Sequence, residues 1–113
     1  MNLALAKQIL HRYWGYDEFR PNQWEVIQEI LSGNHTIALM PTGGGKSLCF
    51  QIPALMLQGL CVVISPLLAL MEDQVNQLNK RAVKAMFIPS GTPKKELERL
   101  MDNAHYGGYL FLY

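Results

Sequence analysis

Between His35 and Ile52 the chain reads HTIALMPTGGGKSLCFQI. The apolar run HTIALM has the composition of a buried strand, and the segment that begins SLCFQI has the length and apolar content of a helix. Three glycines, a lysine and a serine lie between the two. This order of strand, glycine-rich loop and helix predicts an α/β fold with a functional loop at the carboxyl end of its first strand.

The loop residues, MPTGGGKS at positions 40–47, have the chemistry of a phosphate-binding loop. Consecutive glycines let backbone N–H groups turn inward around a polyphosphate, and the following helix N-terminus adds partial positive charge. Lys46 would contact the β- and γ-phosphates, and the Ser47 hydroxyl would ligate a magnesium ion. The predicted nucleotide-binding and catalytic residues of this loop are Thr42, Gly43, Gly44, Gly45, Lys46 and Ser47.

One position departs from the general phosphate-loop pattern. That pattern has glycine five residues before the Gly-Lys pair, where this chain has Met40. A glycine-rich turn needed only for tight strand-to-helix packing is the alternative interpretation. Such a turn has no need of Lys46, so the sequence favours the nucleotide site.

The rest of the chain repeats the alternation of strand and helix. Short apolar runs at 60–65, 83–88 and 109–113 are separated by segments of helical period or length at 46–58, 67–80 and 93–103. Near-continuous apolar strands joined by helices predict a parallel sheet covered on both faces. Two helices, at 3–14 and from Pro21 to Leu31, are expected ahead of the first strand, and Pro53 is expected to kink or break the helix that contains it.

Composition limits the function. The chain has 113 residues, half of them apolar, which suits one compact core. A net charge of +1 argues against binding nucleic acid by bulk attraction, so any DNA contact must be local. Cys49 and Cys61 lie in apolar stretches and are expected to be reduced core residues. With no signal peptide or membrane-spanning segment in the sequence, we expect a cytoplasmic protein.

Three joined motifs resemble the RecQ family of DNA helicases: GYDEFRPNQ at 15–23, MPTGGGKS at 40–47 and LCFQIPAL at 48–55. The resemblance implies a three-layer, RecA-like P-loop fold with helices on both faces of a parallel sheet. It also implies an N-terminal helical segment at 1–34, part of the ATP-binding helicase domain at 35–113, use of ATP and Mg²⁺, DNA unwinding in repair or recombination, and a location at the nucleoid.

In RecQ-like proteins the segment ahead of the phosphate loop reads adenine, and the matching positions are Tyr16, Arg20 and Gln23. A glutamine amide can donate to and accept from adenine, while Tyr16 and the Arg20 guanidinium can stack on the base. The alternative makes Gln23 an ordinary residue of the first helical turn and makes Tyr16 and Phe19 core aromatics. The nearby phosphate loop favours the adenine motif.

A second part of the resemblance concerns DNA. The segment Ser65, Pro66 and Leu67, between a strand and a helix, matches a family loop that touches the DNA backbone. Pro66 as the start of a helix explains the same residues by packing alone, and both interpretations stay open. For the loop at 89–92, Thr92 as a helix N-cap is the favoured explanation. The charged residues Lys94, Lys95, Glu96, Glu98 and Arg99 are expected to form a solvated helix face.

The resemblance also implies that an acidic motif, a second motor domain and zinc-binding and winged-helix regions follow in the parent protein. We therefore expect the isolated chain to hydrolyse ATP negligibly and not to unwind DNA. A non-catalytic nucleotide- or DNA-binding fragment is one alternative, and a small P-loop phosphotransferase is a weaker one. The apolar run at 109–113 is expected to be an exposed sheet edge through which copies of the chain associate.

Overall fold

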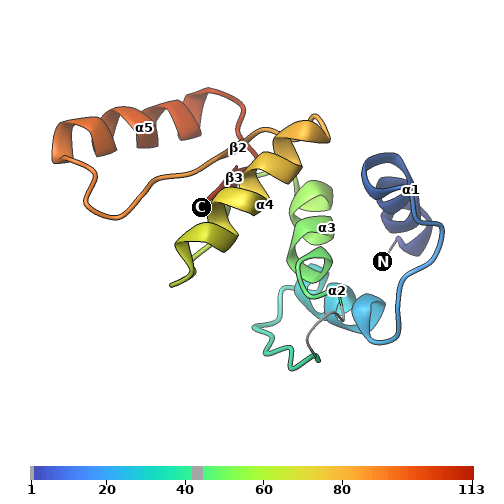
Figure 1. The fold of residues 1–113 in the computed structure, drawn as a ribbon. Coiled ribbons are helices and arrows are strands. Elements are labelled where there is room, and N and C mark those ends of the chain that lie inside the picture. Colours follow the sequence, from blue (N-terminus) through green and yellow to red (C-terminus); the bar gives the residue numbers. More distant parts are fainter. Residues whose placement is uncertain (1, 42–44) are drawn as a thin grey trace. The chain divides into compact units, whose positions relative to one another are not determined.

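The computed structural model describes residues 2–41 and 45–113 (Figure 1). In chain order the described elements are α1 (Leu3–Trp14), α2 (Gln23–Leu31), α3 (Leu48–Leu57), β1 (Cys61–Val62), α4 (Leu68–Lys80), β2 (Ala85–Met86), α5 (Lys94–Tyr106) and β3 (Phe111–Leu112). Each predicted helix is therefore present. Helix and strand alternate from α3 onward, as the apolar pattern predicts.

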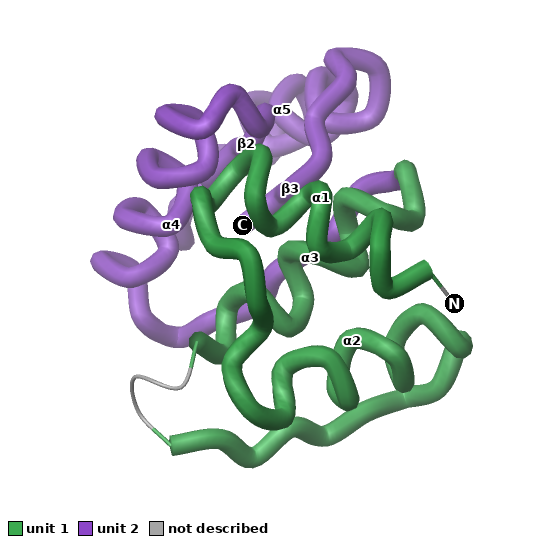
Figure 2. The backbone as a smooth tube through the Cα atoms, turned by 90° about the vertical axis from the view of Figure 1, so that its right-hand side faces the viewer, with its two compact units in different colours: residues 1–58 green, residues 59–113 purple. Residues whose placement is uncertain are grey.

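The chain forms two compact units, Met1–Gln58 and Gly59–Tyr113, coloured separately in Figure 2. The first unit is helical and contains the glycine loop, and the second contains the sheet. The boundary expected after Asn34 divides an adenine-reading segment from a phosphate-binding domain by function, not by packing. That division stays a prediction.

The core of the first unit is made by the inward faces of its three helices. Ala6 and Leu10 of α1 meet Ile27 of α2 and Ile52 of α3, and none of the four is exposed to solvent. Residues four apart on α1 lie on one face, which is the spacing that predicts this helix. Gly15 ends α1 with φ of +78°, and its N–H donates to the carbonyl of His11. Gly15 is thus the C-cap of α1.

Two prolines lie farther from their helices than predicted. Helix α2 begins at Gln23, after Asn22 in the left-handed conformation with φ of +72°, so Pro21 belongs to the preceding turn. Helix α4 begins at Leu68, and Pro66 lies in the loop before it. The prediction that Pro21 opens its helix is wrong, and the interpretation of Pro66 as a helix start, which the sequence left open, does not hold, because each proline lies in a turn that precedes the helix.

Thr92 does not cap α5. The residue at the N-cap is Pro93, and the Thr92 hydroxyl donates to the carbonyl of Pro89 at 2.6 Å. The hydroxyl thus closes the turn before the helix. The predicted N-cap role is wrong because this turn competes for the same side chain.

Helix α3 continues through Pro53, so of the predicted kink or break the break does not occur. Proline lacks the N–H that would donate to the carbonyl of Cys49, four residues earlier. Pro53 is fully buried, and its burial in the first unit offsets part of this cost. The helix ends four residues later at Leu57, where Gln58 adopts φ of +54°.

Residues 35–41 form no strand with the described part of the chain, which corrects the predicted first strand. The side chains of Ile37 and Leu39 are 89% and 93% exposed. A strand requires a neighbour that satisfies its backbone hydrogen bonds, and apolar side chains alone do not supply one. The sequence pattern is that of a strand, but the described strands do not pair with it.

The second unit contains a parallel sheet in the order β1-β3-β2. Phe111 is paired with Cys61 on one side and with Ala85 on the other. The last apolar run of the chain is therefore the central strand, so the prediction that it is an exposed edge is wrong. The reason is that both earlier strands pair with it, which removes the basis for the self-association expected there.

The outer edge of β2 is bonded by a side chain from α4. Asn79 accepts a hydrogen bond from the N–H of Ala85 at 3.1 Å and donates one to the carbonyl of Ala85 at 3.3 Å. The neighbouring carbonyls of Lys84 and Met86 point the other way and accept from β3. The Asn79 amide therefore takes the place that a further strand would occupy at Ala85.

Replacing Asn79 with alanine is expected to lower the free energy of unfolding by about 1 kcal/mol, since two neutral hydrogen bonds at a partly hydrated edge are lost. Urea unfolding followed by circular dichroism measures the change. Asn76→Ala is the matched control, because it removes the same side chain from an exposed position of the same helix. Equal losses in the two variants would show that the Asn79 contact contributes nothing.

Candidate nucleotide-binding site

A cavity of about 220 Å³ lies in the first unit, beside the start of α3. It is lined by Leu10, Tyr16, Glu18, Arg20, Gln23, Gly45 and Leu48. The three residues predicted to read adenine thus share one cavity with Gly45 of the glycine loop. Local sequence patterns do not predict this contact, because Gln23 and Gly45 are 22 residues apart.

Gln23 connects the two motifs. Its side chain is buried, and the amide oxygen accepts a hydrogen bond from the backbone N–H of Arg20 at 2.8 Å. The amide nitrogen donates to the carbonyl of Gly45 at 3.0 Å. Two oriented bonds on a buried amide fix its position at the wall of the cavity.

Two physical reasons favour glycine at position 45. Its φ is +77°, a conformation that residues with a Cβ adopt at a cost. A Cβ added at Gly45 would also lie 2.2 Å from the amide nitrogen of Gln23, well inside contact distance. The close approach of the Gln23 side chain to the Gly45 backbone depends on the missing side chain.

Lys46 and Ser47 lie at the start of α3. The Lys46 side chain is exposed, and Ser47 occupies the N-cap position, so both precede a helix of ten residues. The positive end of the helix dipole is therefore next to both. The other predicted loop residues, Thr42, Gly43 and Gly44, lie outside the described residues.

The aromatic residues near the cavity divide between two roles. Phe19 packs against the core and stacks on Trp24, with ring centroids 6.0 Å apart. Tyr16 is 56% exposed and lines the cavity. The core interpretation thus holds for Phe19 and does not hold for Tyr16.

Cys49 contacts Met40 and Gly45, which the sequence pattern did not predict. Its thiol is 3.6 Å from the sulfur of Met40 and 4.0 Å from the carbonyl of Gly45. Burial raises the pKa of Cys49, so the thiol stays protonated and unreactive near neutral pH. Cys49 therefore packs against Met40 and Gly45 as a buried, reduced cysteine, as expected for a core residue.

The predicted DNA-contacting loop lies in the second unit. The Ser65 hydroxyl accepts a hydrogen bond from the N–H of Leu67 at 3.1 Å, which closes a turn containing Pro66. This loop follows β1, and the loop at 89–92 follows β2. Because the strands are parallel, both loops leave the sheet at its carboxyl edge.

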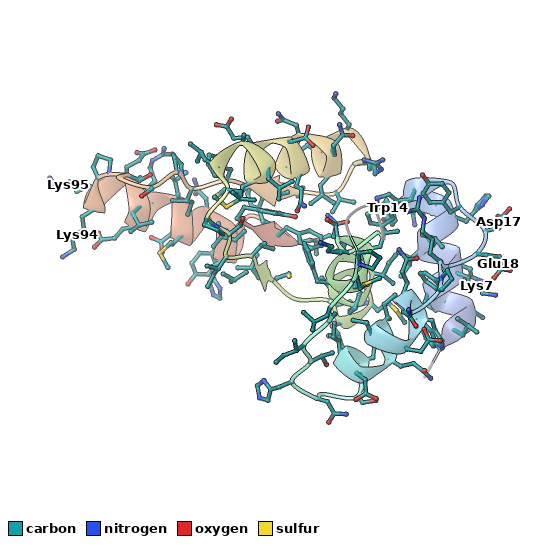
Figure 3. All side chains as sticks on the ribbon, turned by 60° about the horizontal axis from the view of Figure 1, so that its bottom comes forward. Lys7, Trp14, Asp17, Glu18, Lys94 and Lys95 are labelled. Carbon is teal, nitrogen blue, oxygen red and sulfur yellow. The ribbon has the colours of Figure 1, made fainter. Side chains whose placement is uncertain are left out.

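The charged face predicted on α5 is solvated. Lys94 and Lys95 project from the helix (Figure 3), and both are exposed. Arg99 pairs with Glu96, and its hydrogen bond lowers the pKa of the Glu96 carboxyl.

Two features do not occur in the part of the chain that the structure describes. Residues 2–41 and 45–113 bring no three His, Cys, Asp or Glu side chains together as a metal site. Among the same residues, no helix is long and apolar enough to cross a membrane.

A parallel α/β sheet, together with a glycine-lysine-serine loop ahead of a helix, defines the class of P-loop nucleotide-binding proteins. The family of DEAD/DEAH box helicases matches residues 20–107. The chain therefore belongs to this family, whose domain has a RecA-like fold, and the structure shows an incomplete α/β form of it.

The most similar relatives include RecQ-type proteins. RecS of Bacillus subtilis, described as a probable ATP-dependent DNA helicase, is 45% identical over 97% of this chain and 22% of its own length. The ATP-dependent DNA helicase RecQ of the same species is 41% identical over 98% of the chain and 19% of its own length. RecQ of Pasteurella multocida is 43% identical over 96% of the chain and 17% of its own length. The chain spans about a fifth of the length of these curated relatives.

Proposed function

We propose that the chain is the part of a RecQ-type, ATP-dependent DNA helicase that binds ATP, and that the whole protein couples ATP hydrolysis to DNA unwinding in repair or recombination, at the nucleoid. The observation that carries this proposal is the cavity shared by Tyr16, Arg20, Gln23 and Gly45. It lies beside the lysine and serine that suit a polyphosphate.

The phosphate end of the nucleotide would be held at the start of α3. Lys46 would place its ammonium against the β- and γ-phosphates, and the helix N-terminus would add partial positive charge. Ser47 has the hydroxyl that a magnesium ion bound to those phosphates takes as a ligand. The ion would neutralise charge that develops during phosphoryl transfer.

The base end would lie in the cavity. An amide group has two donor and two acceptor positions, and the contacts to Arg20 and Gly45 use one of each. The remaining donor and acceptor suit the edge of adenine, which also presents one of each. Guanine presents a different pattern, so we expect ATP to bind more tightly than GTP. Tyr16 and Arg20 would stack on the base.

DNA would contact the carboxyl edge of the sheet. Ser65, Pro66 and Leu67 form a tight turn there, and the Ser65 hydroxyl, which accepts from the N–H of Leu67, keeps its own proton to donate to a phosphate. The net charge of +1 is consistent with a few local contacts rather than broad attraction.

Calorimetric titration with Mg-ATP and Mg-GTP tests the nucleotide site. The unmodified chain is expected to prefer ATP, and Gln23→Ala is expected to weaken ATP binding by about 10-fold, because the base contact and the tie to Gly45 are lost together. Gln28→Ala, at a half-buried glutamine of the same helix that does not line the cavity, is the control.

The outcomes separate the parts of the proposal. Equal affinity for ATP and GTP would leave a phosphate site but refute the adenine contact. Failure of the chain to bind either nucleotide, with its circular dichroism intact, would refute the proposed site.

A further inference from the structure

The loop that carries Tyr16 and Arg20 is tied to α1 by two polar contacts. The Lys7 ammonium lies 2.8 Å from the Glu18 carboxylate, and Nδ1 of His11 lies 2.9 Å from the Asp17 carboxylate. Lys7 and His11 are four residues apart, so they lie one above the other on the same face of α1. Figure 3 shows Lys7, Asp17 and Glu18 together on one side of this helix.

Lys7 does not line the nucleotide cavity, but its partner does. Glu18 lines the cavity of about 220 Å³ and also a more open cavity of about 350 Å³, and Lys7 lines only the second. The loop at Glu18 and Arg20 is thus a wall between two hollows. Lys7 contacts this part of the loop from the side of the larger cavity, opposite the cavity proposed to bind the base.

The other contacts of the loop fix its ends rather than its middle. Gly15 is bonded to His11 at the end of α1, and the N–H of Arg20 is bonded to Gln23. Between them, Phe19 is held by stacking on Trp24. Lys7 and His11 supply the described polar contacts to the two residues before Phe19.

We infer that Lys7 and His11 are positioning residues for nucleotide binding, which act through Glu18 and Asp17 to hold the base-contacting loop in its binding conformation. This inference rests on the proposed ATP site and deepens it. It places part of the affinity for the base on α1, outside the residues that touch the nucleotide.

Breaking the Lys7–Glu18 pair should weaken binding of the base and leave binding of the phosphates unchanged. Tripolyphosphate has the charge of the nucleotide tail but no base, so it would use Lys46 and Ser47 without the loop. Lys7→Met is expected to raise the dissociation constant for ATP by about two- to fivefold, the scale of one partly exposed ion pair. The dissociation constant for tripolyphosphate should not change.

Calorimetric titrations of the chain with Mg-ATP and with Mg-tripolyphosphate test this inference. Lys7→Met and Glu18→Gln break the pair from either side, and both should change the ratio of the two constants. Lys7→Arg keeps the charge and should retain the original ratio. Arg99→Met is the control, since it breaks another exposed ion pair, which lies within α5 and does not line the cavity.

Each outcome decides between positioning and a merely structural role. A general loss of folding would weaken both ligands together, so equal losses overturn the inference. An unchanged ratio in Lys7→Met and Glu18→Gln, with ATP bound normally, overturns the inference but leaves the proposed function. No ATP binding by the unmodified chain overturns both.

Discussion

Gly45→Ala is expected to lower the free energy of unfolding by about 2–3 kcal/mol and to raise the dissociation constant for ATP about tenfold or more. About 1–2 kcal/mol comes from holding a residue with a Cβ in the left-handed conformation. The rest comes from Gln23, whose amide nitrogen lies 2.2 Å from the position of the new Cβ and must move. Urea unfolding and calorimetric titration measure the two effects.

A second glycine separates these two contributions. Gly33 has φ of +82°, and a Cβ added there meets no atom within 4 Å. Gly33→Ala should therefore incur only the backbone cost and leave ATP binding unchanged. The double variant Gln23→Ala with Gly45→Ala should be less unstable than the sum of the single variants, because the clash is absent. Equal effects of Gly45→Ala and Gly33→Ala would show that the Gln23 contact does not matter.

Lys46→Ala is expected to raise the dissociation constant for Mg-ATP on the order of 10- to 100-fold. One charge-assisted hydrogen bond contributes about 1.5–3 kcal/mol, and the ammonium has no neighbour of equal chemistry in the loop. Because the Lys46 side chain is exposed, the free energy of unfolding should change by less than about 0.5 kcal/mol. Affinity and stability should thus respond separately, unlike the response to Gly45→Ala.

Lys95→Ala is the matched control for this variant, because it removes an exposed lysine from the first turn of another helix, α5. It should bind ATP as the unmodified chain does. If Lys46→Ala bound Mg-ATP with unchanged affinity, Lys46 would not belong to the nucleotide site.

Local patterns in the sequence predicted the helices, including the start of α3 directly after the Gly-Lys-Ser motif. The core face of α1 follows from apolar residues four apart, and the end of α1 follows from Gly15. Helix starts were predicted less well. Pro21, Pro66 and Thr92 are all plausible starting residues, but in each case a turn comes before the helix.

Contacts between distant segments could not be predicted from the same patterns. Nothing near Gln23 indicates that its amide meets the Gly45 carbonyl, because that contact depends on how α2 and α3 pack. The strand pattern at 35–41 is equally local, whereas a strand needs a partner. The central place of β3 is a property of the whole sheet order. The cavity residues were predicted from family resemblance, and their nucleotide contacts stay predictions.

The amide of Asn79 blocks one of the two edges of the sheet, the outer edge of β2. At Ala85 an additional strand would have to displace the two hydrogen bonds from Asn79 before it could pair with β2. Alongside β1, where Val62 is 61% exposed, no such exchange is required within the described residues. An additional strand should therefore pair with β1 rather than with β2. The side chain of Asn79 alone makes the two edges of the sheet unequal in this respect.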